Sequence, residues 1–484
     1  MELRADWLAV EANDDVRRHG LDSDPRADDF DWHPIDIPGQ WVNTPRFAAY
    51  DGPVMYRGSV HAAPPEPGRR RWLTLDGVMY QADVWLDGAY LGDPEGYFSP
   101  HTFDITALSS LTEEHTVAVE VTCAPQGVRG RRNLTGALQP HIDAPNPGGL
   151  WRPVLMYETG PVRIDRLRVI CRDADHRRAH LRLVARVDSD DQRQVVVRTS
   201  VTGAADAGAE QPFTLAAGTN EIEWTIDITD PTLWWPRAIG DQSLATVSVE
   251  IDVDGEVSDR RQRRTGLRQI DWDNWVCSIN GERVFLKGVA VAPRTTALAD
   301  PSAAERAAHA TAALGLDAWR VLGHVADRSW YSAADEQGIV VLQDFPLQWG
   351  HARSVRSQAV EQARAAVDQL AHHPSIVLWN AHNDPAAQPT GEQREGLRRR
   401  LTTTTAQQLP SWNKSVLDRW VKRAFDSVDP SRLTVAHSGV AAHLPQLDGT
   451  DSHLSYGWSY GAIDDLARRA RRQPRSVRFV SEFG

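Results

Sequence analysis

The chain has 484 residues, of which 41% are hydrophobic and 24% charged, as is usual for soluble globular proteins. At ~150 residues per domain, this length predicts about three domains. Its 53 basic and 65 acidic residues give a net charge of −12, which excludes the basic surface expected of a nucleic-acid-binding protein. No apolar run approaches the ~20 residues of a membrane span, so we expect no membrane partner.

The cysteines and the first residues indicate a cytoplasmic location. Cys123, Cys171 and Cys277 lie far apart in the sequence, which is typical of reduced, buried thiols rather than of a disulfide framework or a zinc site. Residues 1–20 carry acidic side chains throughout and lack the apolar core of a signal peptide.

Residues 1–160 predict an all-β domain. Short alternating runs such as Arg71–Leu75, Asp83–Leu86 and Thr116–Val121 are separated by turn signals such as Asp87-Gly88. This spacing of strands and turns is typical of a jelly-roll β-sandwich.

Residues 161–270 continue the strand pattern over about a hundred residues, the size of an immunoglobulin-like β-sandwich. Only the segment Pro231–Pro236 (PTLWWP) interrupts the evenly spaced strands.

Residues 271–484 alternate compact apolar runs with Ala- and Arg-rich helical stretches such as Ser302–Leu314 and Glu361–His372. This alternation predicts parallel βα units. The apolar runs number seven, whereas a (β/α)8 TIM barrel has eight strands, so we expect an incomplete barrel. The runs are Val284–Val291, Asp317–Gly323, Ile339–Phe345, Ser375–Trp379, Leu433–His437, Asp451–Tyr456 and Val477–Phe483.

Two of these runs have a carboxylate at or just beyond their carboxyl ends, which is where barrel enzymes hold their reacting groups. The stretch His373–Asp384 (HPSIVLWNAHND) ends in Asp384, and Arg478–Gly484 (RFVSEFG) contains the isolated Glu482. Two carboxyl groups facing one cavity suit glycoside hydrolysis. Either acid could equally cap a loop or form a salt bridge.

Many motifs, in order along nearly the whole chain, resemble glycoside hydrolase family 2 and, within it, the β-mannosidase-like branch. The resemblance implies a jelly roll, an immunoglobulin-like sandwich and a barrel, with retaining hydrolysis of β-glycosides and no cofactor. The motifs are Ile37–Trp41, Asp51–Arg57, Leu75–Gly92, Gly96–Asp104, Gly148–Pro153, Arg264–Arg268, Asn280–Gly288, Leu316–Val321 and Tyr331–Phe345.

The resemblance also implies roles for individual residues. Glu482 matches the nucleophile and Asn383 the residue that holds the sugar 2-hydroxyl. Asp384 stands where the family has the Glu that acts as acid/base, and its side chain is shorter by one methylene. Arg320 matches an arginine that orients the nucleophile, although an internal salt bridge is the alternative.

Further side chains at strand ends are expected to contact substrate. Asp344 and His453 would bind hydroxyls, and three tryptophans would stack against a sugar ring: Trp349, Trp379 and Trp458. His324 follows the second strand and is another candidate, although an isolated histidine more often satisfies local hydrogen bonds.

Two other motifs do not indicate a function. Gly457–Gly461 (GWSYG) matches the nucleophile elbow of α/β-hydrolases, but no histidine follows His453 to complete a triad in that order. The histidines His372, His373 and His382 lack the paired spacing of metal ligands, so no metal is expected.

The sequence therefore predicts an exo-acting retaining β-glycosidase, nearest to β-mannosidases, that acts on a carbohydrate substrate. The alternative is a catalytically impaired carbohydrate-binding or scaffold protein of the same architecture. A homo-oligomer, or a separately encoded C-terminal remainder that supplies the eighth strand, would be a partner.

Overall fold

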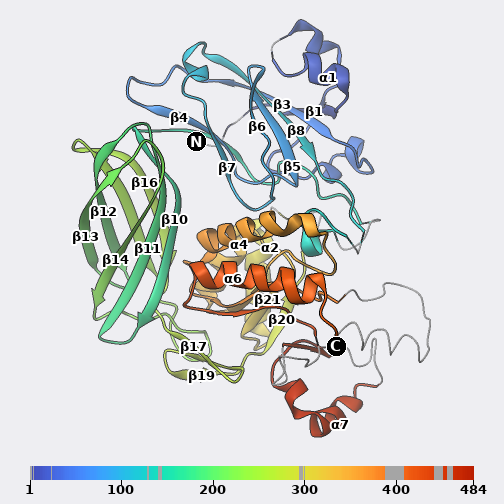
Figure 1. Ribbon diagram of the computed structural model, residues 1–484, viewed down its shortest axis with the longest axis vertical. Helices are drawn as coiled ribbons and strands as arrows, with labels where there is room; N and C mark the ends of the chain where they lie inside the picture. The colour runs from blue at the N-terminus through green and yellow to red at the C-terminus, as the bar shows by residue number, and fades with distance from the viewer. Residues whose placement is uncertain are drawn as a thin grey trace.

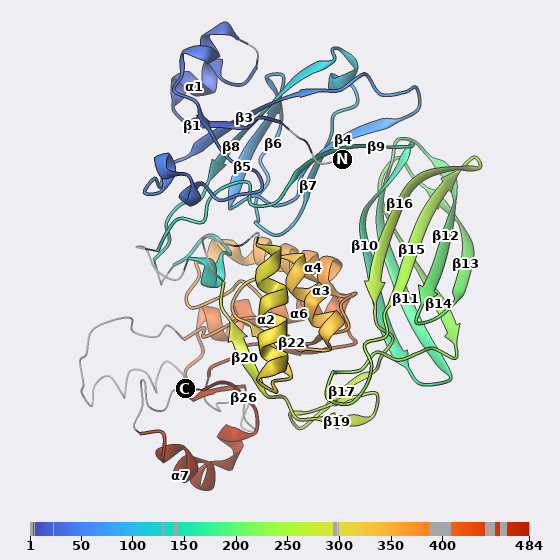
Figure 2. The ribbon, with the colours of Figure 1, turned by 180° about the vertical axis from the view of Figure 1, so that it is seen from behind.

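The structure is a computed structural model, and it describes residues 3, 5–22, 24–127, 130–139, 144–293, 298, 300–386, 408–440, 451–454 and 462–483. Two all-β regions and one α/β region follow each other along the chain (Figure 1). Seen from behind, both β regions lie against the helical side of the α/β region (Figure 2). In the described part of the chain, no helix is both long and apolar enough to cross a membrane.

The first region contains a six-stranded sheet of order β2-β1-β3-β8-β5-β6 and a three-stranded sheet of order β7-β4-β9. Their inner faces bury large side chains such as Trp41, Tyr56 and Trp151 in one core. The strands are β1 (Leu8–Glu11), β2 (His33–Pro34), β3 (Val54–His61), β4 (Arg70–Leu75), β5 (Gln81–Leu86), β6 (Ala89–Gly92), β7 (His101–Asp104), β8 (Glu114–Thr122) and β9 (Val154–Thr159).

The second region contains a three-stranded sheet, β10-β11-β14, and a four-stranded sheet, β13-β12-β15-β16. Alternation along β14 buries Ile222, Trp224, Ile226 and Ile228 in the core between the sheets and exposes the residues between them. The strands are β10 (Val162–Ala174), β11 (Arg178–Ser189), β12 (Arg193–Gly203), β13 (Ala207–Leu215), β14 (Gly218–Thr229), β15 (Ala245–Val253) and β16 (Glu256–Thr265).

A small antiparallel sheet that the sequence analysis did not anticipate joins the second region to the third. It consists of β17 (Ile270–Asp273), β18 (Val276–Ile279) and β19 (Glu282–Val284). The tight turns between these strands place Asn274, Trp275 and Asn280 at positive φ.

Seven parallel strands follow, one in each of the seven predicted apolar runs. Five form a continuous parallel sheet in chain order, and the last two pair with each other. They are β20 (Gly288–Val291), β21 (Ala318–Val321), β22 (Val340–Asp344), β23 (Ile376–Asn380), β24 (Leu433–Val435), β25 (Ser452–Leu454) and β26 (Val480–Phe483). Isolated parallel bridges continue the order beyond the strand ends: Gln348 to Asn383, Asn383 to Ser438, and Ser438 to Asp451.

Helices connect the strands where the sequence predicts them, because their ends carry good caps. α2 (Pro301–Ala313) begins after Asp300, whose side chain accepts from Ser302 N. α3 (Arg328–Gln337) ends at Gly338, which adopts φ 62° in a left-handed cap. Among the residues that the structure describes, this region also contains the α-helices α4 (Arg356–Leu370), α6 (Asp418–Val428) and α7 (Asp465–Arg472).

The three cysteines are free and buried, as expected. Burial raises the pKa of Cys277 to about 12, which makes this thiol a poor nucleophile.

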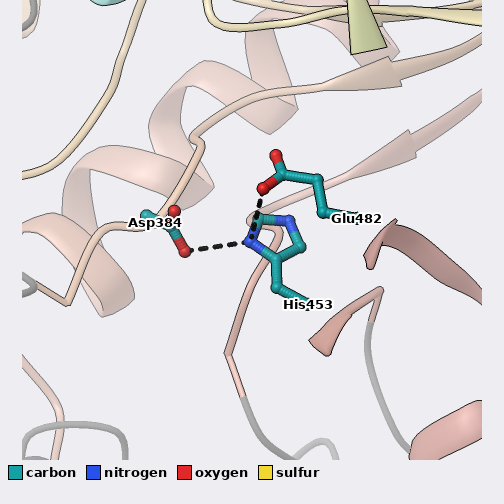
Figure 3. Close-up of side chains that lie close together, drawn as sticks. All are labelled: Asp384, His453 and Glu482. Atoms are coloured by element: carbon teal, nitrogen blue, oxygen red, sulfur yellow. Dashed lines mark ion pairs between the residues drawn. The ribbon is translucent and has the colours of Figure 1, made fainter. Parts of the chain in front are cut away.

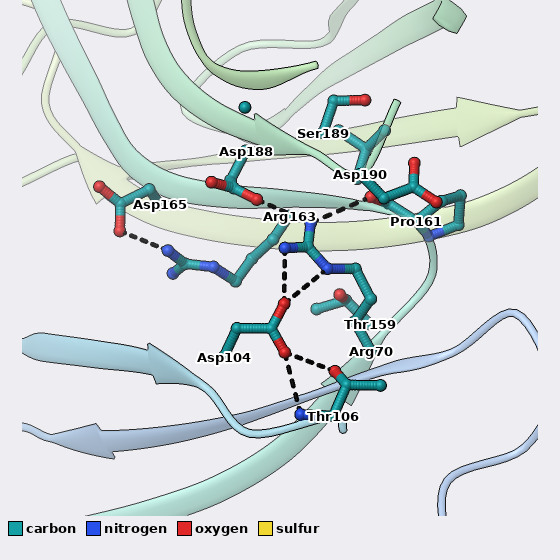
Figure 4. A network of polar contacts seen from close by, with 12 residues as sticks. Arg70, Asp104, Thr106, Thr159, Pro161, Arg163, Asp165, Asp188, Ser189 and Asp190 are labelled. Carbon is teal, nitrogen blue, oxygen red and sulfur yellow. Dashed lines mark hydrogen bonds and ion pairs between the residues drawn. The ribbon is translucent and has the colours of Figure 1, made fainter. Parts of the chain in front are cut away.

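Arg70 of β4 ties the first region to the second (Figure 4). Its guanidinium donates to Asp104 of β7 at 2.7 Å and, from Nη1, to Asp188 of β11 at 2.7 Å. Asp104 also accepts from Thr106 N, so Arg70 and Asp104 each have more than one partner.

Replacing Arg70 with Met should lower the free energy of unfolding by about 1.5–3 kcal/mol, because two partly buried carboxylates lose a charged hydrogen bond. Denaturant unfolding measures the loss. The matched control is Arg193→Met, which removes the local pair with Asp190 and should cost no more than about 1 kcal/mol. Equal losses in the two variants would contradict the bridging role of Arg70.

Candidate active site

Arg320 lies at the centre of a cluster that five parallel strands bring together. Its side chain is only 3% exposed. Nη2 donates to Asp344 Oδ2 at 2.9 Å and to Asn383 Oδ1 at 2.9 Å. Nη1 donates to Ser481 Oγ at 2.6 Å and forms an ion pair of 3.0 Å with Glu482 Oε1. Since β21, β22, β25 and β26 and the loop after β23 all contribute, the cluster exists only in the folded sheet.

Asp344 holds the other side of this guanidinium. It is 1% exposed, and besides Arg320 it accepts from Asn380 Nδ2 at 3.0 Å and from the backbone of Gly323 at 3.1 Å. These donors occupy both carboxylate oxygens. A role in orienting Arg320 therefore accounts for Asp344 better than the predicted contact with a sugar hydroxyl.

The two candidate catalytic carboxylates face one imidazole (Figure 3). His453 Nδ1 lies 3.2 Å from Asp384 Oδ1 and 3.5 Å from Glu482 Oε2. On the other side of the ring, Nε2 lies 2.8 Å from Ser438 Oγ and 2.8 Å from Arg320 Nη1. The imidazole thus bridges the carboxylates to the Arg320 cluster, a role that sequence reasoning did not give to His453.

The carboxylates of Asp384 and Glu482 are close enough to act on one bond. The facing ligand atoms of Asp384, His453 and Glu482 lie within 4.8 Å of one another. Retaining glycosidases separate their two carboxyl groups by about 5–5.5 Å, whereas inverting enzymes need about 6.5–9.5 Å to admit a water. The spacing here fits the shorter class.

The backbone around Asp384 brings its short side chain to the cluster. Asp384 adopts φ 44°, a left-handed conformation that Asp tolerates better than most residues. Gly439, at φ 76°, lies against it: a Cβ there would be 2.1 Å from Asp384 Oδ1 and 2.6 Å from His453 Nδ1. Only glycine fits at this position.

Burial and neighbouring charges act in opposite directions on the pKa of Glu482 and on that of His453, and both pKa values end above their ordinary values. Burial raises the pKa of Glu482 above its ordinary value, although the charges of Arg320 and His453 oppose the rise. Burial would lower the pKa of His453, but the charge of Asp384 and its contact with the ring outweigh this, so the pKa is raised. The charge of Arg320, whose Nη1 lies 2.8 Å from Nε2, opposes this rise.

Four residues that the sequence analysis missed complete the cluster: Ser438, Gly439, Asp451 and Ser481. Ser438 Oγ donates to Asp451 Oδ2 at 2.6 Å, and Ser481 N donates to Asp451 Oδ1 at 3.2 Å. Ser438 and Gly439 directly follow the predicted fifth strand and Ser481 precedes Glu482, so their positions at strand ends were a usable signal.

The three candidate stacking tryptophans differ in their surroundings. Trp349 is half-buried after β22, donates from its backbone to Asn383 O at 3.1 Å, and has Arg131 4.7 Å from its ring centroid. Trp458 lies outside the described residues, as does the Gly457–Gly461 motif.

Trp379 does not belong to the cluster, and the prediction that a sugar stacks on it is corrected. Its ring is fully buried, stacks on Phe425 of α6 at 5.2 Å, and donates to Asp429 Oδ2 at 2.9 Å. Neighbouring Asn380 faces Asp344 instead, and successive side chains of a strand point to opposite faces. Trp379 therefore points at the helices.

His324 is also a buried structural group. Its Nδ1 contacts Leu322 O at 2.9 Å, and burial lowers its pKa to about 4.

The trio Asp384, His453 and Glu482 is the one group in the described part of the chain compact enough to share a metal ion. Hydrolysis by two carboxylates requires no metal. The expectation that the protein needs none stays a prediction.

Replacing Trp379 with Ala should cost about 3–5 kcal/mol of unfolding free energy, because a fully buried aromatic ring is lost. The comparison is Trp349→Ala, at a half-buried position. It should lower the free energy of unfolding by about 0.5–2 kcal/mol, because the contact with Arg131 is lost. Denaturant unfolding measures both. A smaller loss for Trp379 than for Trp349 would contradict the core assignment.

The raised pKa of His453 predicts a pH-dependent contribution to stability. The folded state holds this proton more tightly than the unfolded chain, so the stabilisation is present below the ordinary pKa of about 6.5 and is lost as pH rises through the folded value. Thermal unfolding of His453→Asn should therefore differ from that of the parent more at pH ~5.5 than at pH ~8.5.

His324→Asn is the control of opposite sign. Its lowered pKa makes the contribution of neutral His324 present above pH ~6.5 and lost as pH falls toward about 4. Identical pH trends for the two variants would refute the assigned shifts.

Comparisons with known proteins show which proteins this chain resembles. Residues 162–268 match the sequence model of "Glycosyl hydrolases family 2". Beta-mannosidase B of Emericella nidulans is 25% identical over 415 residues, covering 78% of this chain and 48% of the relative. Exo-beta-D-glucosaminidase of Streptomyces avermitilis is 26% identical over 373 residues, covering 70% of this chain and 40% of the relative. The chain spans about half the length of the curated relatives it matches.

Solved structures show the same fold. The beta-D-mannosidase of Dictyoglomus thermophilum superposes with a TM-score of 0.77 at 18% identity, covering 100% of this chain and 62% of that one. The beta-glucuronidase of Bacteroides uniformis gives 0.77 at 18% identity, covering 100% and 59%. The second β region matches the family model, and much of the chain is similar in sequence to β-mannosidases and shares their fold, so this chain is similar to the β-mannosidases of glycoside hydrolase family 2.

Proposed function

We propose that this chain carries the active site of a retaining exo-β-glycosidase of the β-mannosidase type. The observation that carries the proposal is the spacing of two carboxylates, within 4.8 Å at their facing atoms, on the ends of parallel strands. The names of the relatives, beta-mannosidase and exo-beta-D-glucosaminidase, support a β-linked hexose as the group removed from a carbohydrate substrate.

In this proposal Glu482 attacks the anomeric carbon and forms a covalent glycosyl-enzyme. Its carboxylate must be ionised to attack, and the ion pair with Arg320 at 3.0 Å favours the ionised form despite burial. His453 Nδ1 lies 3.5 Å from Glu482 Oε2 and adds a second contact on that carboxylate. Both contacts also hold the carboxylate in one orientation, which supports reaction at a fixed carbon.

Asp384 protonates the leaving oxygen in the first step and takes a proton from water in the second. The left-handed backbone at Asp384 and the missing side chain at Gly439 compensate for the methylene that the Asp lacks. Asn383, oriented by Arg320 through its Oδ1, binds the 2-hydroxyl of the sugar, an interaction that strengthens toward the transition state. Trp349 offers a ring for the sugar to stack on.

The proposed architecture is a jelly roll over residues 1–160, an immunoglobulin-like sandwich over 161–270 and a (β/α)8 barrel over 271–484. The sheet orders of the two β regions and the seven parallel strands β20 to β26 support it. In the described residues β20 and β26 are not paired with each other. Three free thiols support a reducing compartment such as the cytoplasm.

The second candidate is a catalytically impaired carbohydrate-binding protein of the same architecture. The contact of Asp384 Oδ1 with His453 Nδ1 at 3.2 Å favours it, because a carboxyl group engaged by an imidazole is less available to protonate a leaving oxygen.

Hydrolysis of aryl β-mannosides, β-glucosides and β-glucuronides by the full chain separates the two candidates. Glu482→Gln should reduce turnover by roughly a thousandfold or more, because the covalent step is lost. Asp384→Asn should slow substrates with poor leaving groups by about 10²–10⁴-fold and spare activated aryl glycosides. Nuclear magnetic resonance of the first product should show the β-anomer.

Asp384→Glu is the matched variant, with the same charge and one more methylene. It should keep activity on poor leaving groups within about tenfold of the parent, whereas Asp384→Asn should not. Sugar binding with no hydrolysis in the parent or in Glu482→Gln would favour the binding protein. An α-anomeric first product would refute the retaining mechanism.

A further inference from the structure

A second cavity lies away from the carboxylate cluster, at the junction of all three regions. Its volume is about 660 Å³, and its walls come from β4, β9, β10, β16, α3 and α4. No residue of the Arg320 cluster lines it. Ligand-binding pockets have volumes of about 300–1,000 Å³, so this one could hold a monosaccharide-sized molecule rather than a single ion.

The lining acids are all neutralised by arginines. Asp76 pairs with Arg328 at 2.8 Å, and Asp165 pairs with Arg163 at 2.7 Å. The others have partners as well: Glu158 with Arg71, Asp259 with Arg261, and Asp368 with both Arg166 and Arg168. Because each of these acids already pairs with an arginine, the cavity wall has little attraction for a further cation.

Arg263 of β16 is the lining arginine without a carboxylate partner. Among the described residues no acid lies within ion-pair distance of it, and its one hydrogen bond runs from Nη1 to Gln262 O at 3.0 Å. Burial lowers the pKa of Arg263 to about 10, with Arg328 and Arg261 adding to the effect. A partly buried guanidinium that carries its charge without a counter-ion is a site for an anion.

The surroundings of His372, at the end of the cavity near α4, also carry an excess of positive charge. It is buried against His373, with ring centroids 4.1 Å apart. Burial holds the pKa of His372 well below its ordinary value, and His373, Arg263, Arg432 and Arg328 all act in the same direction. A neutral ring is the form that such surroundings favour.

Hydroxyl groups line the same space. Thr74, Ser99, Thr102, Tyr157 and Ser332 all contribute to the wall. Hydroxyls beside paired carboxylates and guanidiniums offer both donors and acceptors to the hydroxyl groups of a sugar.

We propose that this cavity binds a phosphorylated or carboxylated monosaccharide, whose oxyanion pairs with the guanidinium of Arg263. Because the walls belong to all three regions, the bound ligand joins them and stabilises the whole chain. The proposal concerns a site distinct from the Arg320 cluster and does not depend on the glycosidase reaction.

Calorimetry and thermal unfolding of the full chain test the site. The probes are glucose 6-phosphate, glucuronate and inorganic phosphate, with glucose as the neutral control and sodium chloride matching the ionic strength. We expect a dissociation constant below about 1 mM for glucose 6-phosphate or glucuronate, and a higher unfolding temperature in its presence. The probe that binds tells whether the oxyanion is a phosphate or a carboxylate.

Arg263→Gln should weaken that binding at least about tenfold, because a charged hydrogen bond is lost. The matched control Arg260→Gln makes the same change on the same strand, at a side chain that pairs with Glu250 and lines no part of the cavity, and should bind as the parent does. If Arg263→Gln does not fold, hydrogen exchange of the parent should show protection of β16 and α4 by the bound probe.

The proposal is overturned if none of the charged probes binds more tightly than about 1 mM, or if Arg263→Gln binds as the parent does. It is also overturned if a bound probe leaves exchange in β16 and α4 unchanged. The proposal is likewise overturned if glucose binds as tightly as glucose 6-phosphate and glucuronate, because the oxyanion would then contribute nothing to binding.

Discussion

The buried guanidinium of Arg320 is the interaction on which the candidate active site depends. Placing this charge in the interior costs several kcal/mol of desolvation, which only close, well-oriented partners offset. Asp344, Asn383, Ser481 and Glu482 supply those partners from separate strands. Burial alone would lower the pKa of Arg320, but the charges of Asp344, Glu482 and Asp451 raise it. The guanidinium therefore fixes both the sheet ends and the direction in which Glu482 points.

The alternation of side chains along the parallel strands separates this polar centre from the core around it. On β23, Leu378 joins the cluster of Ala318, Val340 and Leu342, whereas Trp379 packs with Phe425 in the cluster under the helices. Asn380, one residue further, returns to the inner face and donates to Asp344. One face of the sheet thus carries the polar groups, and the other carries the large apolar side chains that hold the helices.

Close backbone approach is the second condition for the site. Asp384 and Gly439 both adopt positive φ, and Gly439 leaves no room for a side chain beside Asp384 and His453. The short side chain of Asp384 thus still comes within 4.8 Å of Glu482 at their facing atoms. Local conformation, rather than side-chain length, sets the distance between these two carboxyl groups.

Much of the organisation could be predicted from the sequence, because it follows local patterns. The seven apolar runs each contain a strand, the predicted helical stretches Ser302–Leu314 and Glu361–His372 overlap α2 and α4, and Arg320, Asp384 and Glu482 lie at or after strand ends. What the sequence left open depends on which face a side chain takes and on residues far apart in the chain. Trp379 was assigned to the site because it ends a strand, yet its face of β23 packs against α6. The bridging position of His453, the neutral wall of paired charges and the unpaired Arg263 arise only when several strands meet. Tertiary structure alone decided them, because electrostatic pairing depends on distance in space and not along the chain.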